Sequence, residues 1–382
     1  MTLPRFFQAV FALCFFANAA LAQIPAAKSR TSVVPASSGK NDVLVEKSAE
    51  AADLESIPAM RVDTAKNLSV ITFGSCNKLD KPPFMFDAIA ANNPDLWIWL
   101  GDIIYCDTTD MNVKAAMYKR LKNNPEYRKL SSKTPIIGMY DDHDYGINDA
   151  GKGFPNKKIS KKLLMDFLGV PPNAPVRKRE GAYQSYTFGK GAQRIKFILV
   201  DTRYFRDTLI RDTSIATKRG RHPIVENPDG DMLGEAQWKW LERELKTSTA
   251  NLNILCTSIQ VISNEHGHEK WGNFPNCRKR LLNLIVQTQP KNLLILSGDR
   301  HMAEISKMDL QGLPYPLYDF TSSGMTHTRT GTSEANKFRV GDMLVRKNFG
   351  LLKVQWDGDR PIVTMQVRTL RNEMLQEIMV KY

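Results

Sequence analysis

Side chains that can bind metals or move protons follow several apolar segments of the chain, directly after each segment ends. They carry thiol, carboxylate, phenol and imidazole groups, and they are Cys76, Asp102, Tyr105, Asp142, His143, Asp299 and His301. A single polar residue in such a place is usually a turn residue or a helix cap. Several together are a stronger signal, because the carboxyl ends of strands line the binding crevice of an open α/β sheet.

The types of these side chains indicate a metal centre, since carboxylate, imidazole and thiolate groups are ligands of zinc and iron. Asp102, in the sequence LGDIIYCD, has two oxygens that can bridge two ions. Asp299 and His301 project to the same side of an extended segment, because side chains alternate along it. A two-metal site can hold a phosphoryl group, generate hydroxide and stabilise the departing oxygen. The sequence therefore predicts a centre suited to phosphate esters.

Cys76 has a second interpretation, because a cysteine of an exported protein can also belong to a disulfide. The cysteines that follow the N-terminal segment are Cys76, Cys106, Cys256 and Cys277. In an oxidising compartment they can form two disulfides, and the sequence alone does not give the pairing. A bond between Cys256 and Cys277 is one conjecture.

The elements that must position these residues alternate along the chain. Near-continuous apolar segments predict strands that are buried on both faces, at 68–74, 95–101, 134–140, 194–200, 252–258 and 292–298. Helical patterns lie between them, at 84–91, 113–122, 159–168, 235–245 and 278–287. This alternation predicts an α/β fold. The late segments 350–356 and 361–368 predict a hairpin, so the sheet is expected to be mixed and a two-sheet sandwich with outer helices would fit.

Three regions are expected along the chain. Residues 1–22 have a positive charge at Arg5, a short apolar stretch and an A-x-A cleavage site that ends at Ala22, which is typical of a signal peptide. Residues 23–66 are rich in Ala, Ser and Pro and predict a linker or mobile arm. Residues 67–382 suit one large domain. The sequence thus predicts an exported protein, periplasmic or extracellular, with no membrane span after removal of the signal.

The formal net charge of +13 favours anionic partners such as phosphate esters, nucleic acid or an anionic membrane surface. A second class of function follows from this charge: a secreted basic protein that binds nucleic acid or anionic surfaces without turnover. The acidic side chains at the strand ends argue against a nucleic-acid groove, because they would repel its phosphates. No stable nucleic-acid partner is therefore expected, and the oligomeric state is left open.

Six sequence motifs resemble those of the alkaline phosphatase D (PhoD-like) family, within the calcineurin-like metallophosphoesterases. In chain order they are FGSCN, LGDIIYCD, YDDHDYGINDAG, VDTRYFRD, EHGHEKWGNFP and SGDRHMAEI. They span about residues 70 to 310 in the order of the family, and together they are highly specific. The resemblance implies a four-layer α/β/β/α sandwich of two mixed sheets flanked by helices. It also implies phosphomonoesterase or phosphodiesterase activity, in which a metal-bound hydroxide at a multinuclear site attacks phosphorus.

The resemblance also implies roles for single residues. Cys76 matches a metal-binding cysteine, Asp102 a bridging aspartate, and Tyr105 a tyrosine that can ligate ferric iron. The implied ligands of the second metal region and the C-terminal ligand pair are Asp142, Asn148, Asp299 and His301. Iron and calcium are the cofactors that the resemblance implies, and zinc or manganese is common in the wider superfamily.

Further candidates would act on the substrate. His143 is a candidate proton donor to the leaving group, although a structural histidine is an equal alternative. Arg203 is a candidate phosphate clamp, with a salt bridge as the alternative. Gln260, His268 and Trp271 are expected to contact substrate, although Trp271 is also the kind of residue that fills a core.

Overall fold

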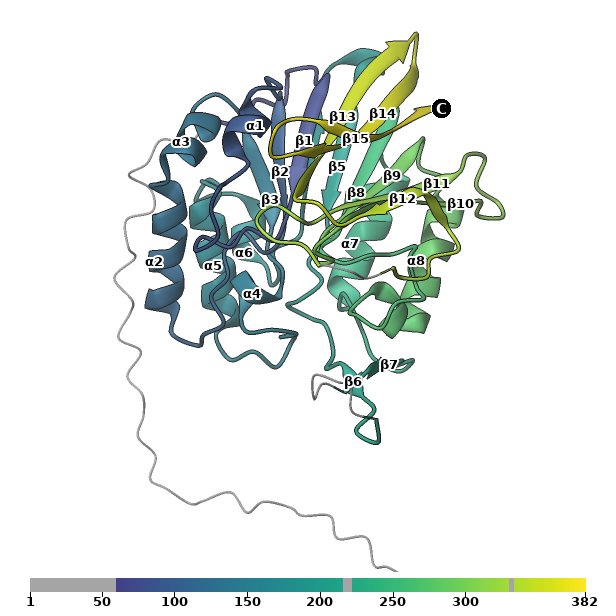
Figure 1. Ribbon diagram of the computed structural model, residues 1–382. Coiled ribbons are helices and arrows are strands. Elements are labelled where there is room, and N and C mark those ends of the chain that lie inside the picture. The colour runs from purple at the N-terminus through teal and green to yellow at the C-terminus, as the bar shows by residue number, and fades with distance from the viewer. Residues whose placement is uncertain (1–59, 216–221, 330–332) are drawn as a thin grey trace, which may run out of the picture. The chain divides into compact units, whose positions relative to one another are not determined.

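The computed structural model describes residues 60–215, 222–329 and 333–382. The predicted signal peptide and most of the predicted linker lie outside these residues. Two facing sheets form the centre of the described fold, and helices cover the outer face of each (Figure 1). The fold is thus the predicted α/β/β/α sandwich.

The first sheet combines parallel strands from the start of the domain with antiparallel strands from its end. Its strand order is β15-β14-β13-β1-β2-β3. The strands are β1 (Val70–Gly74), β2 (Leu96–Leu100), β3 (Ile136–Met139), β13 (Asn348–Asp357), β14 (Arg360–Thr369) and β15 (Met374–Lys381). β1 pairs in parallel with β2 and antiparallel with β13. The sheet is therefore mixed, and the predicted hairpin is confirmed as β13 and β14.

The second sheet has the order β12-β10-β11-β9-β8-β5-β4. Its strands are β4 (Gln184–Phe188), β5 (Ile195–Leu199), β8 (Leu252–Cys256), β9 (Leu293–Ser297), β10 (Ala303–Met308), β11 (Leu317–Ser322) and β12 (Arg339–Leu344). Strands β5, β8, β9 and β11 run parallel, and antiparallel strands flank them. A separate short ribbon pairs β6 (Ile210–Arg211) with β7 (Ile224–Val225).

Helices α1, α2, α3 and α5 lie on the side of the first sheet, and α7 and α8 cover the second (Figure 1). Their bounds, with those of the shorter helices, are α1 (Phe86–Ala90), α2 (Met111–Lys122), α3 (Pro125–Ser131), α4 (Asp142–Tyr145), α5 (Lys157–Phe167), α6 (Pro175–Lys178), α7 (Glu235–Lys246), α8 (Pro275–Thr288), η1 (Gly191–Gln193) and η2 (Trp271–Asn273). The predicted helices and strands are confirmed, with ends that differ by a few residues. No helix in the described ranges is long and apolar enough to cross a bilayer.

Alternation of side chains along β2 shows how the layers are held. Trp97 and Trp99 pack in the cluster shared with the outer helices, whereas Ile98 and Leu100 lie in the core between the sheets. Both faces of this strand are therefore buried, as its continuous apolar sequence indicates. Packing on both faces holds the strand in place, and it thereby positions the loop that follows the strand.

The cysteines of the described chain are free and buried. The conjectured Cys256–Cys277 disulfide is therefore wrong. Cys256 lies in the core between the sheets, whereas Cys277 packs in the cluster under α7 and α8. The second sheet separates the two thiols, so they cannot bond without a rearrangement of that sheet.

Candidate metal centre

Four of the predicted ligands share an unusual backbone conformation. The φ angles of Cys76, Asp102, Asp299 and His301 are +63°, +50°, +67° and +56°. Residues other than glycine rarely adopt this left-handed region, and each instance costs about 1–3 kcal/mol unless the surrounding structure enforces it. These residues follow β1, β2 and β9, so the chain turns sharply just after each of these three strands ends. Such a concentration of strain is typical of a functional site.

The first group of candidate ligands joins three of these strand ends. Ligand atoms of Cys76, Asp102 and His301 all lie within 4.8 Å of one another. The Cys76 thiol donates to Oδ2 of Asp102 at 3.5 Å. The Tyr105 hydroxyl donates to the same Asp102 oxygen at 2.9 Å and lies 3.0 Å from Nε2 of His301. The structure thus brings together the thiol, carboxylate, phenol and imidazole groups that the sequence predicted.

A second group consists of carboxylates and shares Asp102 with the first. Oxygens of Asp102, Asp141, Asp142 and Asp299 lie within 4.8 Å of one another. Burial and the charge of Asp142 raise the pKa of Asp102 well above its ordinary value, and they raise that of Asp299 to about 7. Oδ1 of Asp102 and Oδ2 of Asp141 have no hydrogen-bond partner among the described residues. Buried carboxylates so close together need compensating positive charge, so this donor set fits metal cations.

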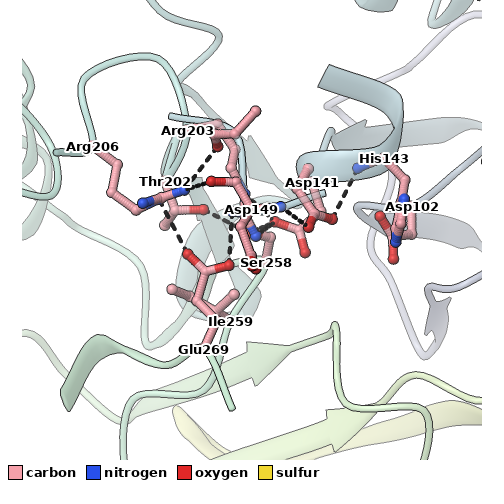
Figure 2. A network of polar contacts seen from close by, with 12 residues as sticks. Asp102, Asp141, His143, Asp149, Thr202, Arg203, Arg206, Ser258, Ile259 and Glu269 are labelled. Carbon is pink, nitrogen blue, oxygen red and sulfur yellow. Dashed lines mark hydrogen bonds and ion pairs between the residues drawn. The ribbon is translucent and has the colours of Figure 1, made fainter. Parts of the chain in front are cut away.

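Arg203 belongs to a buried network of ion pairs beside the carboxylates (Figure 2). Its side chain is fully buried, its Nε donates to Asp141 at 2.6 Å, and its Nη1 donates to Glu269 at 2.8 Å. Arg206 contacts the other Glu269 oxygen at 3.1 Å, and the Ser258 hydroxyl donates to Asp141. The salt-bridge alternative therefore describes the contacts of Arg203 in this structure, and the phosphate clamp stays a prediction. Arg203 holds Asp141 in place.

His143 lies at the edge of the first group. Its Nδ1 is 2.8 Å from Asp107, and its ring packs against that of Tyr105 with centroids 4.2 Å apart. Burial by itself lowers the pKa of His143, but the hydrogen bond to Asp107 and the charges of Asp102 and Asp142 outweigh it and raise this pKa to about 10. These interactions favour the protonated imidazole, which is the state that a proton donor needs.

Two of the predicted substrate contacts belong to the interior. Gln260 is fully buried, and its amide donates to Glu304 and Thr321, each at 2.8 Å. Trp271 is fully buried in the cluster under α7 and α8, and its indole donates to Thr257 at 3.0 Å. The alternative of a core residue thus describes the position of Trp271, and contact of either side chain with substrate stays a prediction.

Two further predicted residues remain at the surface. His268 keeps 37% of its side-chain surface exposed, so it stays a candidate for substrate contact. Asn148 is exposed, whereas the neighbouring Asp149 forms a third carboxylate group with Asp142 and Glu269. The backbone N–H of Asp149 donates to Asp142 at 2.7 Å. The loop after α4 is thus near the predicted second metal region, and within it the half-buried Asp149 rather than the exposed Asn148 joins the carboxylate group.

Several site residues were missed by the sequence reasoning. Asp141 and Asp149 flank predicted residues in the acidic motif YDDHDYGINDAG, so the excess of Asp in that motif was the available signal. Glu269 lies in the motif EHGHEKWGNFP, from which His268 and Trp271 were predicted as site residues but Glu269 was not. His327, whose ring centroid is 4.2 Å from that of His301, follows β11 in a segment that no motif marked.

Two facing mixed sheets carry this donor set at the ends of their strands, and this arrangement fits the predicted class of calcineurin-like metallophosphoesterases. Within that class the chain belongs to the PhoD-like phosphatase family, whose family model matches residues 71–360. The predicted family is thus confirmed.

Known proteins agree with this assignment. The chain is 24% identical over 324 residues to alkaline phosphatase D of Bacillus subtilis (strain 168), which corresponds to 72% of this chain and 53% of that protein. The chain thus spans about half the length of this curated relative. A solved structure of PhoD has a TM-score of 0.64 at 16% identity, over 85% of this chain and 70% of that one. The purple acid phosphatase PPD1 from yellow lupin (Lupinus luteus) has a TM-score of 0.57 at 11% identity, over 84% and 55%. These structural likenesses concern the fold.

Proposed function

We propose that this protein hydrolyses phosphate esters, as a phosphomonoesterase or phosphodiesterase, at a centre that holds more than one metal ion. One observation supports the multinuclear centre above the others. Asp102 belongs both to the group with Cys76 and His301 and to the group with Asp141, Asp142 and Asp299. A carboxylate shared in this way has the position that a bridging ligand needs.

The residues divide into two sets of candidate ligands. Cys76, Asp102, Tyr105 and His301 would hold one cation, and Asp102, Asp142 and Asp299 would hold another. Thiolate and phenolate favour iron in the first set, and an all-oxygen set favours calcium, while zinc or manganese also suits these ligands. The cations would supply Lewis-acid polarisation of the phosphoryl group and would acidify a coordinated water.

Other side chains orient the centre and move protons. Arg203 and Ser258 fix one oxygen of Asp141, so that carboxylate cannot rotate freely. Asp107 engages Nδ1 of His143, which leaves Nε2 as the atom to donate a proton to the departing oxygen. The proton transfer would offset the negative charge that develops on the leaving group. This role for His143 is part of the proposal.

We also propose that the enzyme is exported and acts in the periplasm or outside the cell. The A-x-A site that ends at Ala22 supports export. In either place the enzyme would meet phosphate esters, and its net charge of +13 would attract such anions.

Metal content and ester hydrolysis, measured together, test the proposed function. The purified mature protein is analysed for bound metals, and hydrolysis of p-nitrophenyl phosphate and of bis-p-nitrophenyl phosphate is compared with and without a chelator. We expect bound metal and turnover that the chelator abolishes, and the preferred ester separates a monoesterase from a diesterase. Turnover that survives complete removal of metal would contradict the proposal. Salt-sensitive binding of anionic polymers without any hydrolysis would support the alternative of a binding protein.

A further inference from the structure

A second group of charged side chains lies beside the metal centre, and its charge is positive. We call it the cationic cluster and define it as His266, His268, Lys270, Arg300 and Arg329, with the carboxylate of Glu334 among them. The chain itself ties this cluster to the candidate ligands. Arg300 stands between Asp299 and His301, and the backbone N–H of Arg329 donates to the carbonyl of His301 at 3.0 Å.

The cationic cluster carries more positive charge than its contacts neutralise. In the described part of the chain one carboxylate, that of Glu334, contacts the cluster: it pairs with Nη2 of Arg300 and lies 3.5 Å from Nε2 of His268. Burial and the nearby Arg300 lower the pKa of Lys270 to about 8 and lower that of His266 far below its ordinary range. Among the described residues Arg300 pairs with this carboxylate and Arg329 pairs with none, which leaves an uncompensated positive charge.

Arg300 also has unused hydrogen-bonding capacity. Its side chain is fully buried, yet Nε and Nη1 have no hydrogen-bond partner among the described residues. The same holds for Nε of Arg329. A buried charged donor without a partner is unfavourable, so a binding partner for this charge would stabilise the arrangement.

The exposed side of the cluster is formed by Arg329 and His268. Nη2 of Arg329 lies 3.1 Å from Nδ1 of His268, and Nη1 contacts Nε2 of the same ring. Both side chains are only partly buried, whereas Arg300 lies behind them without exposed surface. The backbone N–H of Arg329 donates to the carbonyl of His301, and Arg300 adjoins Asp299 in the sequence, so the cluster lies beside the candidate ligands. A molecule bound at the metals can therefore reach Arg329 and His268.

We propose that Arg329 and His268, supported by Arg300, bind a second oxyanion of the substrate, beyond the phosphoryl group that is hydrolysed. The substrate class is then a phosphate ester whose leaving group carries its own carboxylate or phosphate. This inference rests on the proposed function only in assuming that the phosphoryl group of the substrate binds at the metal ions. A guanidinium is suited to this task because its planar donors match the paired oxygens of a carboxylate or phosphate.

Binding measurements test the subsite without relying on turnover. Calorimetry with the metal-loaded protein compares glycerol 3-phosphate with 3-phosphoglycerate, which differs by a carboxylate. A second pair, fructose 6-phosphate and fructose 1,6-bisphosphate, supplies a phosphate instead and so distinguishes the two sources of the oxyanion. We expect the second anion to tighten binding by about tenfold or more in at least one pair.

Variants assign any such preference to named residues. Arg329→Gln and His268→Gln should each remove most of the preference for the second anion. Arg346→Gln is the matched control, because Arg346 is an exposed arginine that pairs with Glu373 outside the cationic cluster, and it should keep the preference.

Equal affinities within both pairs in the unaltered protein, or a preference that persists in both cluster variants, would overturn the inference. Its failure differs from failure of the proposed function. A preference for the second anion without hydrolysis of any ester would contradict the proposed function alone. Chelator-sensitive hydrolysis without such a preference would contradict the subsite alone.

Discussion

Individual residues at the metal centre carry strain that the rest of the fold must support. The left-handed conformations of Cys76, Asp102, Asp299 and His301 cost free energy, and so does the proximity of the carboxylates. Neither feature benefits a protein without bound cations. The cations would offset the repulsion, so we expect stability and function to conflict at these positions.

Replacement of Asp299 by Asn tests this conflict. In the presence of a chelator at pH 8, we expect Asp299→Asn to raise the melting temperature by a few degrees, because burial and Asp142 disfavour the charge that the amide removes. With metal ions present, the same variant should lose a ligand and melt at a lower temperature than the unaltered protein. Thermal unfolding by circular dichroism measures both. A lower melting temperature in chelator would show that the carboxylate does not destabilise the metal-free state.

Replacement of Asp102 by Ala tests the shared ligand. We expect Asp102→Ala to abolish ester hydrolysis while the protein still folds, because both groups of ligands lose the carboxylate that they share. Hydrolysis rates, metal content and far-ultraviolet circular dichroism check this. Asp87→Ala is the control, since Asp87 is an exposed residue paired with Lys129 on the surface. Near-normal activity of Asp102→Ala would refute the site assignment.

The sequence indicated these candidate ligands better than it indicated their supports. Cys76, Asp102 and His301 were singled out because each follows an apolar strand and can bind a metal, and the structure brings them together. The partners of Arg203 could not be named from the sequence, because Asp141 and Glu269 lie 62 and 66 residues away along the chain. Only the fold shows that a guanidinium is already paired.

At the scale of elements, helix α2 holds two of the loops that form the site. The buried Nζ of Lys114 donates to the carbonyls of Cys106 at 2.9 Å, His143 at 3.0 Å and Gly146 at 3.3 Å. It therefore joins the loop after β2 to the segment around α4. The Asp144 carboxylate makes a similar connection, because it accepts from the backbone N–H groups of Ile103 and Asp141.

Replacement of Lys114 by Met removes this connection while it keeps the length of the side chain. We expect Lys114→Met to lower the free energy of unfolding by about 1–3 kcal/mol, since buried carbonyls lose their donor. We also expect hydrolysis to slow, because both loops carry site residues. Denaturant unfolding and rates at saturating ester provide the two measurements. Lys119→Met, at an exposed position of the same helix, is the control. Unchanged stability and rate in Lys114→Met would rule out the connection.

Most elements were accessible to sequence reasoning because their apolar patterns are strong, as in β2 and β9. Strands β4, β10, β11, β12 and β15 were missed. The residues of β12 and β15 are largely exposed or half-buried and lack a continuous apolar pattern, whereas polar residues such as Glu304 and Asp319 interrupt the buried sequences of β10 and β11. Such strands form through pairing with neighbours that are distant in the sequence. Local patterns carry little information about that pairing.

At the scale of the whole molecule, packing holds the described chain without cross-links between cysteines. We therefore expect thiol titration of the denatured, unreduced mature protein to detect four thiols, those of the four free cysteines. We also expect a reducing agent to leave the melting temperature unchanged, whereas a chelator should lower it, because a ligand that binds only the native state stabilises that state. Fewer thiols, or a melting temperature that falls on reduction, would indicate a disulfide.

The pairing of β1 with β13 has a consequence for how the protein is made. Phe73 of β1 lies opposite Gly350 of β13, so one edge of the strand that leads to Cys76 is completed by residues synthesised near the end of translation. A nascent chain that has not yet passed Asn348, or one released early from the ribosome, leaves that edge unpaired. We therefore expect the turn that carries Cys76 to reach its native structure last. Quality control could then recognise incomplete chains by their inability to retain metal.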